Sequence, residues 1–227
     1  MNLKPLELGR SVQGKPLNAF YFEGRRFSGR PLVLLGGVHG DEIEGVWLME
    51  ELLSTWSSTP PSLEMDVLIW PRVNPDGVEA GARWNARNVD LNRNLPTKDW
   101  TPEMKNPRYP PGPHAASEPE NKALVSLIER HQPRAILSAH SFSKYQVNSN
   151  GPAREWAEAL ARVSGYPVTE DIGYPTPGAL GTYAGKEKLI PTITLEIERG
   201  LDRERVLELH VPVVEAAIAY WENKEMN

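Results

Sequence analysis

The chain of 227 residues contains no cysteine. This absence excludes disulfide bridges and thiolate ligands, so a bound metal must be held by histidine and carboxylate side chains. The sequence also lacks a Gly/Ser-rich or strongly charged linker, while 40% of its residues are hydrophobic. We therefore expect one globular domain that covers residues 1–227.

Long apolar runs and concentrations of basic residues are also missing, and the formal net charge is -5. No segment approaches the length of a membrane span, and no basic stripe suits a nucleic acid, so neither a membrane nor a nucleic acid is an expected partner. Residues 1–10 lack the apolar stretch of a secretory signal. A cytoplasmic location is the resulting expectation.

Short apolar segments alternate with amphipathic ones along the chain. We expect strands at residues 17–22, 32–36, 67–70, 135–139 and 192–197, the first of them at the edge of a sheet. Helices are expected at about residues 42–53, 123–129, 153–163 and 203–221, with Ser117 and Glu120 as a capping box and a bend at Pro212. This alternation predicts an α/β fold with a mixed, mostly parallel central sheet and helices on both faces.

Polar groups follow four of the predicted strands. His39 comes just after one strand, His140 ends another, and Glu196 lies near the end of a third, while the turn signal at residues 74–77 follows a fourth. In open α/β sheets, ligands bind at the carboxyl ends of the strands. The sequence therefore predicts an active site at this edge. Two long polar stretches, residues 74–116 and 169–190, are expected to be loops that are either functional or disordered.

A metal site is predicted from His39, Glu42 and His140. His39 and Glu42 lie three residues apart where a strand turns into a helix, and Gly40 between them would permit a tight turn. His140 would join them from a distant strand end. Two histidines and one glutamate suit catalytic zinc, which keeps a coordination position for water, so one Zn²⁺ per chain is expected. The other histidines are left out of the site: His114, His131 and His210.

Two further polar groups suit hydrolysis. Glu196 and Glu198 alternate with apolar residues, so both face away from the apolar side of their strand and either could be a general base. Residues 83–94 contain three arginines and four asparagines, which suits the binding of a carboxylate by guanidinium groups. The alternatives are a solvent-facing edge strand and a solvated polar loop.

Taken in order, these segments resemble the zinc carboxypeptidase family related to carboxypeptidase A. The matching pieces are HGDE (39–42), NPDG (74–77), RWNAR (83–87), VDLNRN (89–94), SAHSFS (138–143), a tyrosine-bearing loop and TLE (194–196). They span Gly36 to Glu198, most of the chain. The resemblance implies the family's α/β fold, a zinc cofactor and hydrolysis of a small peptide substrate.

Position by position, the resemblance also implies roles for single residues. It implies zinc ligands at His39, Glu42 and His140, with Asp90 bonded to the other nitrogen of His39. It also implies that Asn92 and Arg93 bind the substrate's terminal carboxylate and that Arg83 stabilises the oxyanion. Glu196 would be the general base, with Glu198 as the fallback, and Tyr174 would cover the bound substrate. The position that sets side-chain preference in the family falls near Gly181, which leaves room for a larger or polar group.

Several segments resemble one branch of the family, which cleaves the γ-D-glutamyl-meso-diaminopimelate amide in murein peptides during peptidoglycan recycling. They are LGRSVQGKPL (8–17), GGVHGDE (36–42), NVDLNRNLP (88–96) and YPTPGALGTY (174–183). Two alternatives stay open. One is an N-acyl amino acid deacylase of the succinylglutamate desuccinylase type, which shares an HGxE-like pair. The other is a zinc-containing protein that binds peptides or muropeptides without catalysis.

Overall fold

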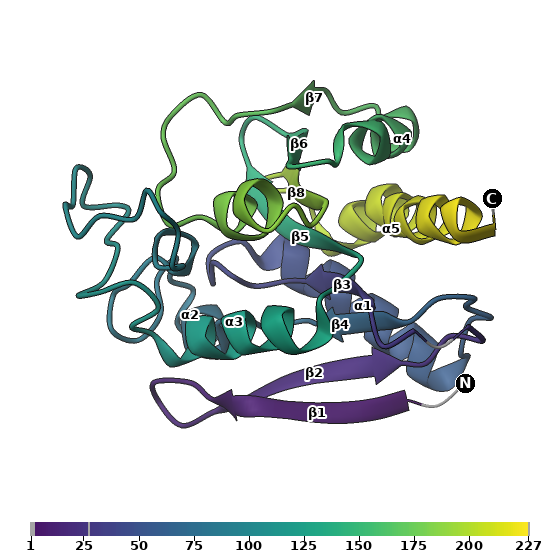
Figure 1. Ribbon diagram of the computed structural model, residues 1–227, viewed down its shortest axis with the longest axis horizontal. Coiled ribbons are helices and arrows are strands. Elements are labelled where there is room, and N and C mark those ends of the chain that lie inside the picture. The colour runs from purple at the N-terminus through teal and green to yellow at the C-terminus, as the bar shows by residue number, and fades with distance from the viewer. Residues whose placement is uncertain (1–2, 27, 227) are drawn as a thin grey trace.

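The computed structural model describes residues 3–26 and 28–226, and it contains one mixed sheet of eight strands (Figure 1). The strands are β1 (Leu3–Arg10), β2 (Pro16–Phe22), β3 (Leu32–Leu35), β4 (Val67–Trp70), β5 (Ala135–Phe142), β6 (Gln146–Asn150), β7 (Val168–Thr169) and β8 (Thr192–Glu198). The helices are α1 (Ile43–Ser58), α2 (Pro75–Ala80), α3 (Pro119–His131), α4 (Arg154–Ser164) and α5 (Arg203–Met226), with short helices η1 (Leu91–Arg93) and η2 (Gly181–Glu187).

The middle of the sheet is parallel. The strand order is β1-β2-β4-β3-β5-β8-β6-β7, in which β4, β3, β5 and β8 run in parallel. β2 joins β4, and β6 joins β8, in the antiparallel sense. All residues of β3 and β4 are buried and apolar, as expected for strands that are covered on both faces. The predicted α/β fold is confirmed.

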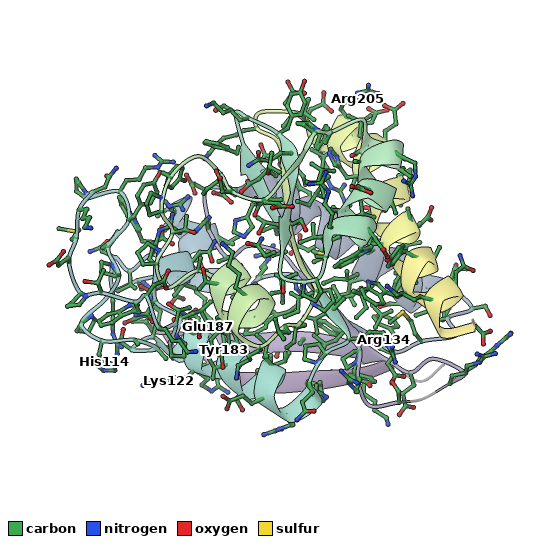
Figure 2. All side chains as sticks on the ribbon, turned by 45° about the horizontal axis from the view of Figure 1, so that its top comes forward. His114, Lys122, Arg134, Tyr183, Glu187 and Arg205 are labelled. Atoms are coloured by element: carbon green, nitrogen blue, oxygen red, sulfur yellow. The ribbon has the colours of Figure 1, made fainter. Side chains whose placement is uncertain are left out.

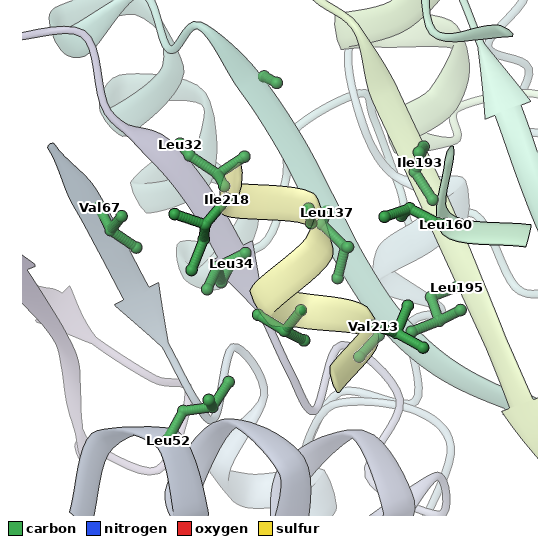
Figure 3. Close-up of a cluster of buried hydrophobic side chains, with 14 of the residues drawn as sticks. Leu32, Leu34, Leu52, Val67, Leu137, Leu160, Ile193, Leu195, Val213 and Ile218 are labelled. Carbon is green, nitrogen blue, oxygen red and sulfur yellow. The ribbon is translucent and has the colours of Figure 1, made fainter. Parts of the chain in front are cut away.

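Helices cover both faces of the sheet. On one face, α1, α4 and α5 enclose a core in which Val213 and Ile218 of α5 lie with Leu34 of β3 and Leu137 of β5 (Figure 3). On the other face, α3 and η2 close a second core. Because the site residues of β5 and β8 point to this second side, the layer of η2 decides the shape of the space above them.

Three details of the expected layout are wrong. Residues 17–22 are not an edge strand, because β1 pairs outside β2. The expected capping box is absent: α3 begins after Glu118, and the Ser117 hydroxyl bonds Glu118 instead of the helix backbone. The long polar stretches also hold structure of their own, since α2 and η1 lie in the first and η2 in the second. The helix α5 runs through Pro212, and a bend there stays a prediction.

Both polar stretches come together on one side of the sheet, where their loops are neighbours (Figure 1). Leu95 donates its backbone N–H to the carbonyl of Gly178 at 3.0 Å, and Gly178 donates its own to the Thr97 hydroxyl at 3.0 Å. Gly178 has a φ of 72°, and a Cβ there would lie 2.2 Å from the carbonyl oxygen of Arg93. This contact joins the two loops above the carboxyl ends of β3, β5 and β8.

Candidate active site

Three buried side chains converge on one point at the carboxyl end of the sheet. Nδ1 of His39 lies 2.8 Å from Oε1 of Glu42 and 3.1 Å from Nδ1 of His140, which in turn lies 2.8 Å from Oε2 of Glu42. Catalytic zinc binds such atoms at about 2.0–2.2 Å, which places neighbouring ligand atoms roughly 3.3 Å apart. The cluster therefore has the spacing and the donor set of a zinc site, and it could hold a metal ion.

The outer nitrogen of each imidazole has its own partner. Nε2 of His39 lies 3.1 Å from Oδ1 of Asp90, and Nε2 of His140 lies 3.0 Å from Oγ of Ser138. A carboxylate only accepts, so a metal-bound His39 would carry its proton on Nε2 toward Asp90 and would turn its Nδ1 lone pair to the metal. Asp90 therefore lies against the outer nitrogen of His39, the position that the family resemblance implied. Ser138 was missed, although its place two residues before His140 puts it on the same strand face.

The electrostatics of the cluster favour positive charge. Burial favours neutral His39, but the carboxylates of Glu42 and Asp90 outweigh burial and raise the pKa of this imidazole. Burial also opposes the ionisation of Glu42, yet the two histidines hold its pKa well below the usual range. A divalent cation supplies the same positive charge without a proton, so the residues present fit a metal ion.

Close packing shapes the turn that carries His39 and Glu42. Gly40 was expected to permit a tight turn through its backbone freedom. Instead, its missing side chain is what matters, because a Cβ at Gly40 would lie 1.9 Å from the carbonyl carbon of Gly77. The backbone freedom belongs to Gly37, whose φ is 63°. Residues 74–77, the turn predicted after β4, thus provide none of the three clustered side chains and instead pack against the turn that carries His39 and Glu42.

Glu196 faces the cluster from the neighbouring strand. In the parallel pair of β5 and β8, Glu196 is the register partner of His140, so both side chains point to the same face. Burial raises the pKa of Glu196 to about 7, opposed by His140 and assisted by the carboxylate of Glu42. Such a pKa suits a general base near neutral pH, and a bound cation would lower it. Glu198 is exposed, which favours Glu196 over the fallback.

His39, Glu42, His140 and Glu196 line a cavity of about 130 Å³. Two arginines of the polar segment, Arg83 and Arg93, line the same cavity. Arg83 bonds Oε1 of Glu42 through Nη1 and Oδ2 of Asp90 through Nε, each at 3.0 Å. Arg93 is only 4% exposed, and no carboxylate in residues 3–26 or 28–226 forms an ion pair with it. Arg93 helps to lower the pKa of Asp90 at longer range, but no carboxylate of the described residues pairs with it directly, so its guanidinium can accept an anionic group from a ligand.

Other polar side chains of the segment hold its fold. The Asn85 amide donates to Glu118 at 2.7 Å, and the Asn94 amide donates to the carbonyl of Pro111 at 2.7 Å. Arg87 is exposed and lies 3.7 Å from Glu118. Asn85 and Asn94, both members of the predicted carboxylate-binding cluster, thus hold the loop in place instead. The tertiary contacts decide which polar residues of such a loop are left for a ligand.

A second cavity of about 480 Å³ opens beside Glu196 and contains the region around Gly181. Asn148, Asn150 and Thr194 line it together with Asn92, whose Oδ1 accepts the backbone N–H of Leu180 at 2.8 Å. A Cβ at Gly181 would lie 2.5 Å from the Asn150 side chain. The space that Gly181 was expected to leave is therefore filled partly by Asn150, a residue that no sequence pattern singled out.

Tyr174 lies at the entrance, between the two cavities. The three excluded histidines lie outside both cavities. His114 is exposed at the rim of its loop (Figure 2), and His210 is buried between the Tyr166 hydroxyl, at 2.9 Å from Nε2, and the Val206 carbonyl, at 2.8 Å from Nδ1. His131 ends α3.

With this geometry in place, comparison with known proteins decides the family. A family model described as zinc carboxypeptidase matches residues 2–195. The chain belongs to the zinc carboxypeptidase family. The match ends one residue before Glu196, so the assignment of that glutamate rests on the strand register and not on the family match.

Two relatives that match most of the chain carry the name murein peptide amidase A. Murein peptide amidase A of Vibrio campbellii is 32% identical, over 92% of this chain and 89% of the relative. Murein peptide amidase A of Escherichia coli is 34% identical, over 77% of this chain and 74% of the relative. The crystal structure of murein-tripeptide amidase MpaA from Escherichia coli O157 matches with a TM-score of 0.76 at 29% identity, covering 94% of this chain and 90% of that one.

The fold extends to more distant structures. Bovine thrombin-activatable fibrinolysis inhibitor in complex with tick carboxypeptidase inhibitor gives a TM-score of 0.78 at 20% identity, covering 98% of this chain and 91% of that one.

The family match, the relatives and the three-residue cluster together show that the chain is a zinc-dependent enzyme of the metallopeptidase and amidase type that acts on peptides. Among the described residues, no helix is both long and apolar enough to cross a bilayer. The cytoplasmic location stays a prediction.

Proposed function

We propose that this enzyme hydrolyses the γ-D-glutamyl-meso-diaminopimelate amide of murein peptides. The observation that carries the proposal is the buried guanidinium of Arg93, which has no direct ion pair among the described residues and lines the same cavity as His39, Glu42 and His140. This substrate has a carboxylate next to the cleaved amide, and its leaving group carries a further ammonium and carboxylate. The names of the relatives that cover most of the chain agree with this substrate.

In the proposed site, His39, Glu42 and His140 hold one zinc ion. When bound, zinc supplies a Lewis acid that polarises the substrate carbonyl and lowers the pKa of a water molecule. Asp90 and Ser138 keep the two imidazole rings oriented through their outer nitrogens.

The chain's own groups then move the protons and balance the charge. Glu196 takes the proton of the attacking water and gives it to the leaving amine. Arg83 faces the developing oxyanion, where a positive group stabilises the transition state. Asn92 and Arg93 hold the substrate carboxylate, and Tyr174 covers the bound substrate. Fixing both ends of the scissile amide reduces the entropy that must be lost in the reaction.

The cavity beside Glu196 would take the side chain of the leaving diaminopimelate. Its wall of Asn148, Asn150 and Thr194 is polar, and Lys186 and Asp171 lie at its rim. An uncharged aromatic or aliphatic side chain would leave these polar groups without partners, which disfavours its binding. A side chain that ends in both an ammonium and a carboxylate can pair with groups of each sign.

The test is a product assay with zinc-loaded protein. The substrates are L-alanyl-γ-D-glutamyl-meso-diaminopimelate, the same tripeptide with L-lysine in place of diaminopimelate, and N-succinylglutamate. We expect release of free diaminopimelate from the first at a kcat/KM at least tenfold above that for the lysine peptide. Turnover of N-succinylglutamate alone would support the deacylase alternative and refute the proposal. Binding of the tripeptide without release of any amino acid would also refute it.

A further inference from the structure

Tyr109, in the loop between η1 and α3, lies against three groups to which the proposed function gives roles. Its ring centroid is 4.8 Å from Cζ of Arg93 and 5.1 Å from Cζ of Arg83. The ring also stacks on Tyr174, with centroids 5.7 Å apart and planes inclined by 16°, and the two phenol oxygens lie 3.4 Å apart. The Tyr109 ring thus contacts Arg93, Arg83 and Tyr174, the residues proposed to bind the substrate carboxylate, to face the oxyanion and to cover the substrate.

The backbone on both sides of Tyr109 is tied to the segment that carries the arginines. The carbonyl of Arg108 accepts the indole N–H of Trp84 at 2.8 Å, and the carbonyl of Pro110 accepts the backbone N–H of Asp90 at 2.9 Å. Pro110 also has a restricted φ. Because these bonds involve the two chain neighbours of Tyr109, residues 84–90 fix the position of its ring relative to the arginines.

Arg93 depends on this ring more than Arg83 does. Arg83 is held by two ion pairs with buried carboxylates, at 3.0 Å each. For Arg93, the side-chain hydrogen bond within the described chain is that of Nη1 to the carbonyl of Asn92, at 2.6 Å. The aromatic face of Tyr109 attracts the guanidinium without occupying its in-plane donors. Those donors remain available for a carboxylate.

The stacked tyrosines also form a wall. Arg93, Tyr109 and Tyr174 line both the cavity of the metal cluster and a neighbouring cavity of about 390 Å³. Contact with Tyr109 therefore keeps Tyr174 between these two spaces. Burial raises the pKa of Tyr174 to about 12, and its contact with Tyr109 adds to this effect, so the ring stays neutral.

We propose that Tyr109 is a positioning residue for the substrate carboxylate, acting by holding the Arg93 guanidinium and the Tyr174 ring in place. This inference rests on the proposed carboxylate clamp of Asn92 and Arg93. Since the clamp acts on the bound substrate and on the transition state alike, losing its alignment weakens binding in both. The ring should therefore change KM more than kcat, and only for substrates that carry the carboxylate.

The test compares a tripeptide with its analogue in which the carboxyl group next to the cleaved amide is a carboxamide. For Tyr109→Leu, we expect KM for the carboxylate substrate to rise about tenfold, the size of one or two lost cation–π contacts, with kcat within threefold. KM for the carboxamide should stay within twofold. Tyr109→Phe keeps the ring and should retain KM within threefold. Tyr220→Leu, a matched change on α5, should alter neither substrate.

Several outcomes would overturn the role of Tyr109. They are an equal rise in KM for carboxylate and carboxamide, an unchanged KM in Tyr109→Leu, or a Tyr109→Phe variant as impaired as Tyr109→Leu. If Tyr109→Leu does not fold with one zinc per chain, Tyr109→Met replaces it, because methionine fills the space without an aromatic face and should raise KM for the carboxylate substrate in the same way; an unchanged KM there would also overturn the role. A wild-type enzyme inactive on the murein tripeptide would refute the substrate, and the same comparison is then made with a carboxylate-ended peptide that it does cleave.

Discussion

Replacing Asp90 by asparagine should weaken zinc binding by roughly 10–100-fold, which is about 1.4–2.8 kcal/mol. Asp90 is fully buried, and each of its oxygens has a separate task. Oδ1 accepts from Nε2 of His39, and Oδ2 accepts from Nε of Arg83. Burial opposes its ionisation, but His39, Arg83 and Arg93 outweigh burial and hold its pKa below the usual range.

An asparagine can fill only one of these tasks. If its oxygen accepts from His39, its amide N–H groups face the N–H of Arg83 across a distance of 3.0 Å, and two donors are left without an acceptor. The lost negative charge also makes the His39 imidazole a weaker ligand. Both effects act in the same direction, so we expect the upper part of the range.

The measurement is a zinc dissociation constant from competition with a chromophoric chelator near neutral pH. Asp66→Asn is the matched control, because Asp66 is equally buried but accepts backbone N–H groups of Gly24, Ser28 and Gly29 instead of contacting the metal cluster. Its zinc dissociation constant should stay within twofold of the wild-type value. The reasoning fails if Asp90→Asn binds zinc as tightly as the wild type, or if Asp66→Asn loses as much affinity.

Three other variants test separate parts of the structure. Glu196→Gln should lose a factor of about 10²–10⁴ in kcat, since it cannot accept a proton, and keep one zinc per chain in metal analysis; full activity would exclude this residue as base. Gly181→Ala should reduce the free energy of unfolding in urea by about 1–3 kcal/mol through its clash with Asn150, 2.5 Å away, and a double-mutant cycle with Asn150→Ala should show a favourable coupling; additive effects would contradict the clash. Burial lowers the pKa of His210, so the unfolded chain binds more protons below pH ~6.5 and stability falls on acidification, by at most about 1.4 kcal/mol per pH unit for one proton; His210→Gln should flatten this part of the urea-midpoint profile, and an unchanged slope would refute the assignment.

Much of the scaffold could be predicted because its strands carry strong local signals. Leu32–Leu35 and Val67–Trp70 are short continuous apolar runs, which are typical of strands covered on both faces. β6 gave no such signal, because Gln146–Asn150 is almost entirely polar and becomes a strand through its pairing with β8. Tertiary pairing overrides weak propensity in such segments.

The sequence by itself determined the donor set of the metal site and the strand ends that bring it together, because ligand chemistry and strand periodicity are local properties. His39, Glu42 and His140 could be selected on that basis. Only the tertiary structure decided which polar groups are left free for a substrate. Only the family resemblance singled out Arg93 in the segment from Arg83 to Asn94. Composition and spacing do not separate it from the residues that brace the loop, since that division depends on partners far away in the chain. The place of Tyr109 depends on the same long-range contacts.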